Sequence, residues 1–423
     1  MGVAVGNWLR RRRVVILVAL LAAVAAGAAG HYLRERRQAE RLAAERLLTE
    51  GEQALAAREY ARAREILDRY LAERPADTRV RLLAARAARQ ARIYSDAREH
   101  LRRCRADGGD AESIDVEESL LDVLLGDERP VAALRERARR DDDLALVILE
   151  VLVQRDLDTY QLGSALDGFT RYLSRRPDDL HALLGRGFVW ERFLNFADAL
   201  EDYRKAVATH PENDRARLKL ADTLLIVGTP DEALTHYRWL AERWPERPPV
   251  RLGLARCYRR LARPEEAAKL LDGLLAEFPN HGETLWERGE MELEQGRPAT
   301  AESLLRKAAS QRPFDRRVQY AMYRCLLRLD RAAEARTFDA RVKRLDADLA
   351  RLSAVRGEVM DRPNDAALRC EGGLLFMRNG EREEGLRWLQ LALRLDPKCE
   401  PARAALAAEK LLPRQPSGQE REK

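Results

Sequence analysis

Prolines recur along most of this chain at a constant interval of 34 residues. The longest unbroken series is Pro177, Pro211, Pro245, Pro279 and Pro313, and Pro363 and Pro397 form a second pair at the same interval. Self-similarity at a fixed period of about 20 to 50 residues is typical of chains that repeat one supersecondary unit. The spacing therefore predicts an extended repeat array instead of two or three independent globular domains.

Small and large residues follow the same 34-residue lattice. Alanine recurs on this lattice twelve residues ahead of the proline positions, at 63, 97, 165, 199, 233, 267, 301 and 335. A large apolar or aromatic residue follows four positions later, as at Phe169, Tyr203 and Tyr237. This pattern predicts two amphipathic helices per unit, which approach closely at the small positions. The proline then ends the second helix, because its ring cannot continue the hydrogen-bond ladder.

The unit beginning at Leu180 carries the pattern most completely, with Gly187, Trp190, Phe196, Ala199, Tyr203, Ala206 and Pro211. In these places it resembles the tetratricopeptide repeat family. The resemblance implies an all-α fold, a right-handed superhelical solenoid of helix-turn-helix repeats. It covers residues 44–400, or about ten units, and is weaker in the units at 112–145 and 146–179.

Outside this array, the sequence divides into short segments of distinct composition. We predict a basic flank at residues 1–13, a transmembrane helix at 14–33 and a charged helical connector at 34–43. After the array, residues 401–412 are predicted to form a capping helix that covers the last repeat, and 413–423 a polar, disordered tail.

The segment from Val14 to Gly30 contains no charged residue, and arginines flank it on both sides. Its length and its continuation into a charged helical stretch favour an uncleaved membrane anchor. A cleaved signal peptide is the alternative, because the small residues at 26–28 form a plausible cleavage site. The tight arginine cluster at 10–13 favours a cytoplasmic N-terminus, with the array on the far, periplasmic side.

One unit lacks its proline, so that Pro313 and Pro363 are 50 residues apart. The extra residues follow Ala335 and predict an elongated helix near 336–358. An apolar stripe runs along it at Phe338, Val342, Leu345, Leu349 and Leu352. Such a stripe either packs against the neighbouring repeat or forms an arm for homodimerisation at 338–352.

Charge and cysteine content exclude several classes of function. The net charge of +6 arises within residues 1–41, and the rest of the chain is balanced, which argues against nucleic-acid binding. The five cysteines are widely spaced and are interpreted as small buried residues, without a metal site. Glu287, Glu290 and Glu294 share one helix and are interpreted as a solvated face. The sequence thus predicts no catalytic site, no cofactor and no enzyme activity.

By resemblance to the family, first helices of successive units line a concave surface that binds proteins or peptides. The residues predicted to contact a peptide there are Phe188, Arg192, Arg256, Arg259, Arg260, Trp286, Tyr320, Arg324, Arg328 and Arg378. Several arginines on one surface would suit carboxylates of an acidic segment. The alternative is that these arginines pair with local acids.

These observations predict a membrane-anchored scaffold that recruits or assembles partner proteins at a bacterial-type membrane. Two alternatives are a soluble periplasmic adaptor released by signal-peptide cleavage and a non-catalytic subunit of an enzyme complex. The fold alone does not identify the partner.

Overall fold

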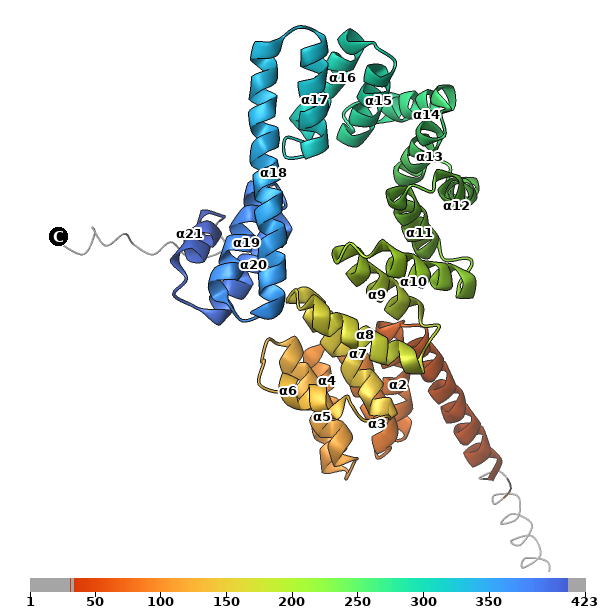
Figure 1. Cartoon of the computed structure of the whole chain (residues 1–423). Helices are drawn as coiled ribbons and strands as arrows, with labels where there is room; N and C mark the ends of the chain where they lie inside the picture. Colours follow the sequence, from red (N-terminus) through yellow and green to blue (C-terminus); the bar gives the residue numbers. More distant parts are fainter. Residues whose placement is uncertain (1–30, 32–33, 410–423) are drawn as a thin grey trace, which may run out of the picture. The chain divides into compact units, whose positions relative to one another are not determined.

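The computed structural model describes residue 31 and residues 34–409, and all regular elements in this range are helices (Figure 1). The chain divides into two compact units, residues 1–151 and 152–423. The predicted membrane segment 14–33, apart from His31, and the tail after 409 lie outside the described residues. No helix among the described residues is both long enough and apolar enough to cross a bilayer.

The helices alternate as first and second helices of successive repeats. In the N-terminal unit they are a helix over 34–56, α2 (Tyr60–Glu73), α3 (Thr78–Gln90), α4 (Tyr94–Ala106), α5 (Ala111–Leu124), α6 (Val131–Arg137) and the start of α7 (Asp143–Asp158). With only seven residues, α6 is the shortest second helix, and it lies in a unit where the repeat pattern is weak.

The C-terminal unit continues the alternation. After α7 come α8 (Leu162–Arg175), α9 (Leu180–Arg192), α10 (Phe196–Thr209), α11 (Asp214–Val227), α12 (Pro230–Arg243), α13 (Pro248–Arg260) and α14 (Pro264–Glu277). The remaining helices are α15 (Gly282–Glu294), α16 (Pro298–Gln311), α17 (Arg316–Arg328), α18 (Ala332–Asp361), α19 (Ala366–Arg378), α20 (Arg382–Leu395) and α21 (Glu400–Ala408).

Local sequence signals set the helix ends. Several first helices begin after an Asp or Asn whose side chain accepts a hydrogen bond from a backbone N–H of the first turn, as Asp179 does from Ala182 at 2.8 Å. Second helices end two residues before the lattice prolines, for example at Thr209 before Pro211. Each turn between paired helices contains a left-handed residue, either glycine, as at Gly228, or a residue such as Tyr160 (φ 55°).

The core follows the lattice that the sequence predicted. All eight lattice alanines are at most 1% exposed. The small position of the first helix faces the large position of the second, and a Cβ added at Gly187 would lie 2.5 Å from the ring of Tyr203. No larger side chain fits between these helices, which confirms the predicted close approach.

The missing proline has the predicted consequence, because α18 runs for 30 residues. Of its apolar stripe, Phe338, Val342, Leu345 and Leu352 are buried within this chain, and Leu349 is 45% exposed. The stripe therefore packs against neighbouring helices, α17 and α19 (Figure 1), and leaves little apolar surface for a dimerisation arm. At the end of the array, α21 buries Ala402 and Leu406 against the last repeat, as a capping helix does.

All five cysteines are free thiols, and four of them are buried. Burial raises the pKa of Cys257 to about 12 and that of Cys325 to about 11. Thiols in such surroundings are poor nucleophiles and poor metal ligands. The four buried cysteines pack as small apolar side chains, as predicted, whereas Cys399 is half-buried.

Candidate functional site

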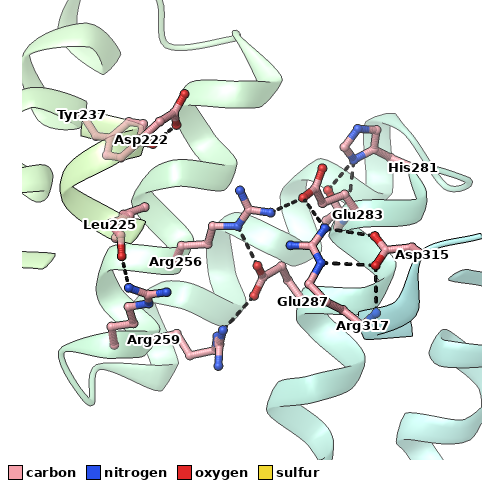
Figure 2. Close-up of polar contacts among 12 residues, drawn as sticks. Asp222, Leu225, Tyr237, Arg256, Arg259, His281, Glu283, Glu287, Asp315 and Arg317 are labelled. Carbon is pink, nitrogen blue, oxygen red and sulfur yellow. Dashed lines mark hydrogen bonds and ion pairs between the residues drawn. The ribbon is translucent and has the colours of Figure 1, made fainter. Parts of the chain in front are cut away.

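The candidate site is the face carried by the first helices α9, α11, α13, α15 and α17, hereafter the first-helix face. Figure 2 shows its central part, where side chains from successive first helices point toward one another. The repeat geometry places positions 34 residues apart beside each other on neighbouring helices. Charged residues of one repeat therefore lie beside charged residues of the next repeat on this face.

Two arginines of α13 contact acids of α15. Arg256 bonds to Glu287 at 2.6 Å and also to Glu283 (Figure 2). Arg259 lies 3.2 Å from Glu287 and 2.8 Å from Glu294. Glu287 is only 2% exposed, so its charge depends on these two guanidiniums. Both arginines therefore pair with local acids, which was the alternative to binding an acidic segment of a partner.

The network continues into α17. Arg317 contacts Asp315 at 3.0 Å and Glu283 at 3.5 Å. Burial opposes ionisation of Glu283, but Arg256 and the neighbouring arginines outweigh it and hold the pKa of Glu283 below its ordinary value. Arg317 also stacks on Trp286, with its guanidinium carbon 4.4 Å from the ring centroid.

The interpretation of Glu287, Glu290 and Glu294 as a solvated face is wrong for the first two. Glu290 is 9% exposed, and burial raises its pKa, although Arg324 lies 3.4 Å away. Only Glu294 is largely accessible. The helical spacing alone could not reveal this, because the neighbouring first helices cover that side of α15.

The other predicted arginines have three kinds of environment. Arg260 and Arg328 each donate to a carbonyl of the preceding first helix, that of Leu225 and that of Leu293. Arg378 bonds to Asp348 of α18 at 2.9 Å. Among the described residues, Arg192 has neither a hydrogen bond nor an ion pair, and it stacks on Phe188.

The predicted aromatic residues differ in exposure. Phe188 is 38% and Tyr320 40% exposed, as expected for residues that contact a partner. Trp286 is partly buried against the core cluster of α15 to α17, and its buried indole N–H has no acceptor among the described residues. The first-helix face thus presents Phe188 and Tyr320 near opposite ends of a series of paired charges.

A second copy of the arginine–glutamate arrangement was not predicted from the sequence. In the N-terminal unit, Arg86 and Arg89 of α3 each donate to Glu117 of α5 at 2.7 Å. Every member of this trio lies 170 residues, or five repeats, before its counterpart in Arg256, Arg259 and Glu287. The signal in the sequence is the 34-residue lattice, on which these charged residues align just as the small residues do.

No grouping of three or more His, Cys, Asp or Glu side chains suited to a metal ion occurs in the described part of the chain. Chemically, the first-helix face offers paired charges and exposed aromatic rings. These are groups that contact peptides.

Comparison with protein families identifies the repeat. Family models described as "Tetratricopeptide repeat" match residues 48–111, 191–248, 224–286 and 292–359, which together span more than half of the chain. The helical hairpins and the family models define a solenoid of tetratricopeptide type. The chain belongs to the tetratricopeptide repeat proteins.

Several solved structures are similar to this chain at low sequence identity. A tetratricopeptide repeat protein from Parabacteroides merdae is 17% identical, with 67% of this chain and 98% of that chain covered and a TM-score of 0.37. PilW, a type IV pilus biogenesis factor, is 16% identical, with 48% and 94% covered and a TM-score of 0.41. No curated protein matches the sequence significantly.

Proposed function

We propose that this protein is a scaffold that binds partner proteins through the first-helix face of its C-terminal unit. The observation that carries the proposal is the exposure of Phe188 on α9 and Tyr320 on α17, while the central arginines of α13 are already paired with acids of α15. Exposed aromatic rings fixed on rigid helices are the side chains that most often anchor a bound peptide. Membership in the tetratricopeptide repeat family supports a role in protein interaction.

The charge pairing indicates what kind of partner would bind. A purely acidic segment would have to displace Glu283 and Glu287 from Arg256 and Arg259, and it would leave buried carboxylates without partners. A partner that places apolar side chains on Phe188, Tyr320 and Ile226 disrupts none of these pairs. Ile226, at the end of α11, is 57% exposed. We therefore propose apolar anchors in the partner, with charged residues setting its orientation.

Replacing both exposed rings tests this function. The double variant Phe188→Ala and Tyr320→Ala is expected to weaken partner binding roughly thirtyfold or more, because loss of even one aromatic anchor typically costs about 2 kcal/mol. The measurement is affinity capture of the full-length, detergent-solubilised chain, with partners quantified by mass spectrometry.

The matched control is Trp244→Ala and Phe278→Ala, two rings of similar exposure (43% and 44%) at the ends of second helices. Partners that are lost from the first variant and kept by the control support the proposal. Equal recovery with both variants would move the interaction away from the first-helix face. Charge reversal at Arg256 is unsuitable for this test, because it would place an acid against Glu283 and Glu287.

We further propose that residues 14–33 attach the protein to a membrane, with a cytoplasmic N-terminus and a periplasmic repeat array. The uncharged stretch Val14–Gly30 and the arginines at 10–13 support this arrangement. An alkaline phosphatase fusion after residue 409 is expected to be active, and a fusion of a cytoplasm-only fluorescent protein there to be dark.

Carbonate extraction then distinguishes an uncleaved membrane anchor from a cleaved signal peptide. An anchored chain stays in the pellet and retains Met1, whereas a chain cleaved near Ala28 is released with a new N-terminus. An inactive phosphatase fusion together with a bright fluorescent one would show that the array faces the cytoplasm instead.

A further inference from the structure

The first and last repeats of the C-terminal unit contact each other. Tyr160, in the turn between α7 and α8, packs on Trp388 of α20 with ring centroids 4.9 Å apart. Trp388 also packs on Phe376 of α19 at 5.4 Å. Tyr160 and Trp388 are 6% and 1% exposed. Residues more than 200 positions apart thus form one buried aromatic cluster.

Three arginines surround this cluster. Arg192 and Arg356 lie over the ring of Tyr160, with guanidinium carbons 5.6 and 5.7 Å from its centroid, and Arg369 lies over Trp388 at 5.1 Å. None of the three forms an ion pair within the described residues. Burial lowers the pKa of Arg356, and lowers that of Arg369 to about 10. Arg369 is 2% exposed, and Arg192 and Arg356 are half-buried. Charges removed from water are normally paired, so three guanidiniums without an ion pair at one place are unusual.

Polar atoms without partners occur at the same place. Among the described residues, the hydroxyl of Tyr160, Nε of Arg192 and of Arg356, and Nη1 of Arg369 are buried and form no hydrogen bond. This contrasts with Arg256, Arg259, Arg324 and Arg378, which all contact acids. The guanidiniums of this cluster therefore lack direct acid contacts within the described chain, although Glu381 and Glu384 lie near enough to Arg356 to favour its charged form.

A cavity of about 730 Å³ adjoins the cluster, and Tyr160, Phe188 and Arg192 form part of its wall. Other lining residues come from the start of α20, including Glu381 and Glu383. Both glutamates are exposed, and neither has an ion-pair partner in the described chain. The lining also contains Asp158, Arg382 and the ion pair of Glu384 with Arg387. Charges of both signs thus line a single cavity, which has room for a few residues of a peptide.

We propose that this cavity binds a zwitterionic segment of a partner protein, with a carboxylate on Arg192 and a basic side chain on Glu381 and Glu383. Arg356 and Arg369, behind the wall, strengthen the field that attracts the carboxylate. Phe188 provides an apolar surface for the chain between the two charges. The proposal specifies the chemistry of the partner segment bound at one end of the first-helix face. It therefore rests on the proposed function, which is partner binding at that face.

Calorimetry on the full-length, detergent-solubilised chain tests the site. The probe is the peptide acetyl-Glu-Gly-Lys-amide, compared with acetyl-Gln-Gly-Lys-amide and with inorganic phosphate. The Glu peptide is expected to bind roughly tenfold more tightly than the Gln peptide, because it alone forms the charge-assisted bond to Arg192. Arg192→Gln should abolish that preference, and Glu381→Gln with Glu383→Gln should weaken both peptides.

The control is Arg394→Gln, an exposed arginine on α20 away from the cavity lining, which should bind as the wild type does. A wild-type chain that does not distinguish the two peptides, or that binds phosphate as tightly as the Glu peptide, would overturn the proposal. Circular dichroism of Arg192→Gln checks that its fold is intact. If the peptides do not bind but partners are still captured through Phe188 and Tyr320, only the cavity proposal fails. If partner capture is also unaffected by the loss of those rings, the proposed function fails as well.

Discussion

Replacing Glu117 by alanine is expected to lower the unfolding free energy of the N-terminal unit by about 3–5 kcal/mol. The carboxylate joins α5 to both Arg86 and Arg89 of α3, and the side chains of Glu117 and Arg89 are each 1% exposed. Without Glu117, Arg89 keeps its charge in a buried place and has no acid to pair with. Chemical denaturation, with hydrogen exchange to locate the transition, measures the loss.

Two further variants show whether burial is the cause. Glu118→Ala removes a carboxylate that is 46% exposed and pairs with Arg105 at the surface, and it should change stability by less than about 1 kcal/mol. Glu117→Leu combined with Arg89→Met removes both charges and should recover most of the loss. If Glu117→Ala and Glu118→Ala had equal effects, the buried trio would not hold these repeats together.

The corresponding trio in the C-terminal unit is expected to be less sensitive. Arg256 and Arg259 are 25% and 22% exposed, so their guanidiniums can turn toward water when Glu287 is absent. The same three residue types on the same lattice thus contribute different stability, because burial sets the penalty for an unpaired charge.

Replacing Ala199 by tryptophan is expected to destabilise the C-terminal unit by about 3 kcal/mol or more. Ala199 is fully buried on α10, at the small position where it packs closely on α9. An indole there must push the two helices apart, and the neighbouring repeats would move with them. Thermal unfolding followed by circular dichroism measures the effect.

Glu201→Ala serves as the comparison, because Glu201 is an exposed residue of the same helix. It should leave the unfolding midpoint within about a degree or two of the wild type. Equal midpoints for the two variants would contradict the repeat register, since they would mean that position 199 does not face the paired helix.

Much of the fold could be predicted because the repeat is local. Paired helices of one unit are adjacent in sequence, so alanine, glycine and proline at fixed places determine which faces meet and where each helix ends. The absent proline between Pro313 and Pro363 predicted the elongated helix α18 for the same reason. Left-handed turn residues such as Leu194 (φ 59°) were not predicted, because among common residues only glycine indicates that conformation in a sequence.

The candidate site was predicted less completely. Resemblance to the family indicated which helix positions form the first-helix face, and Phe188 and Tyr320 are exposed there as expected. It did not indicate that Arg256 and Arg259 already bind Glu283, Glu287 and Glu294. These pairs join residues about 30 positions apart on different helices, and composition does not show which acid an arginine contacts.

The sequence by itself determined the helical hairpin, its 34-residue period and the elongated helix, because these depend on contacts between chain neighbours. Tertiary structure alone decided that Glu290 is buried, that Glu117 and Glu287 each serve two arginines, and that Tyr160 packs on Trp388. The reason is physical: burial and charge pairing between repeats depend on how successive hairpins stack. A contact across more than 200 residues depends on the summed rotation of every hairpin between them, which no local pattern specifies.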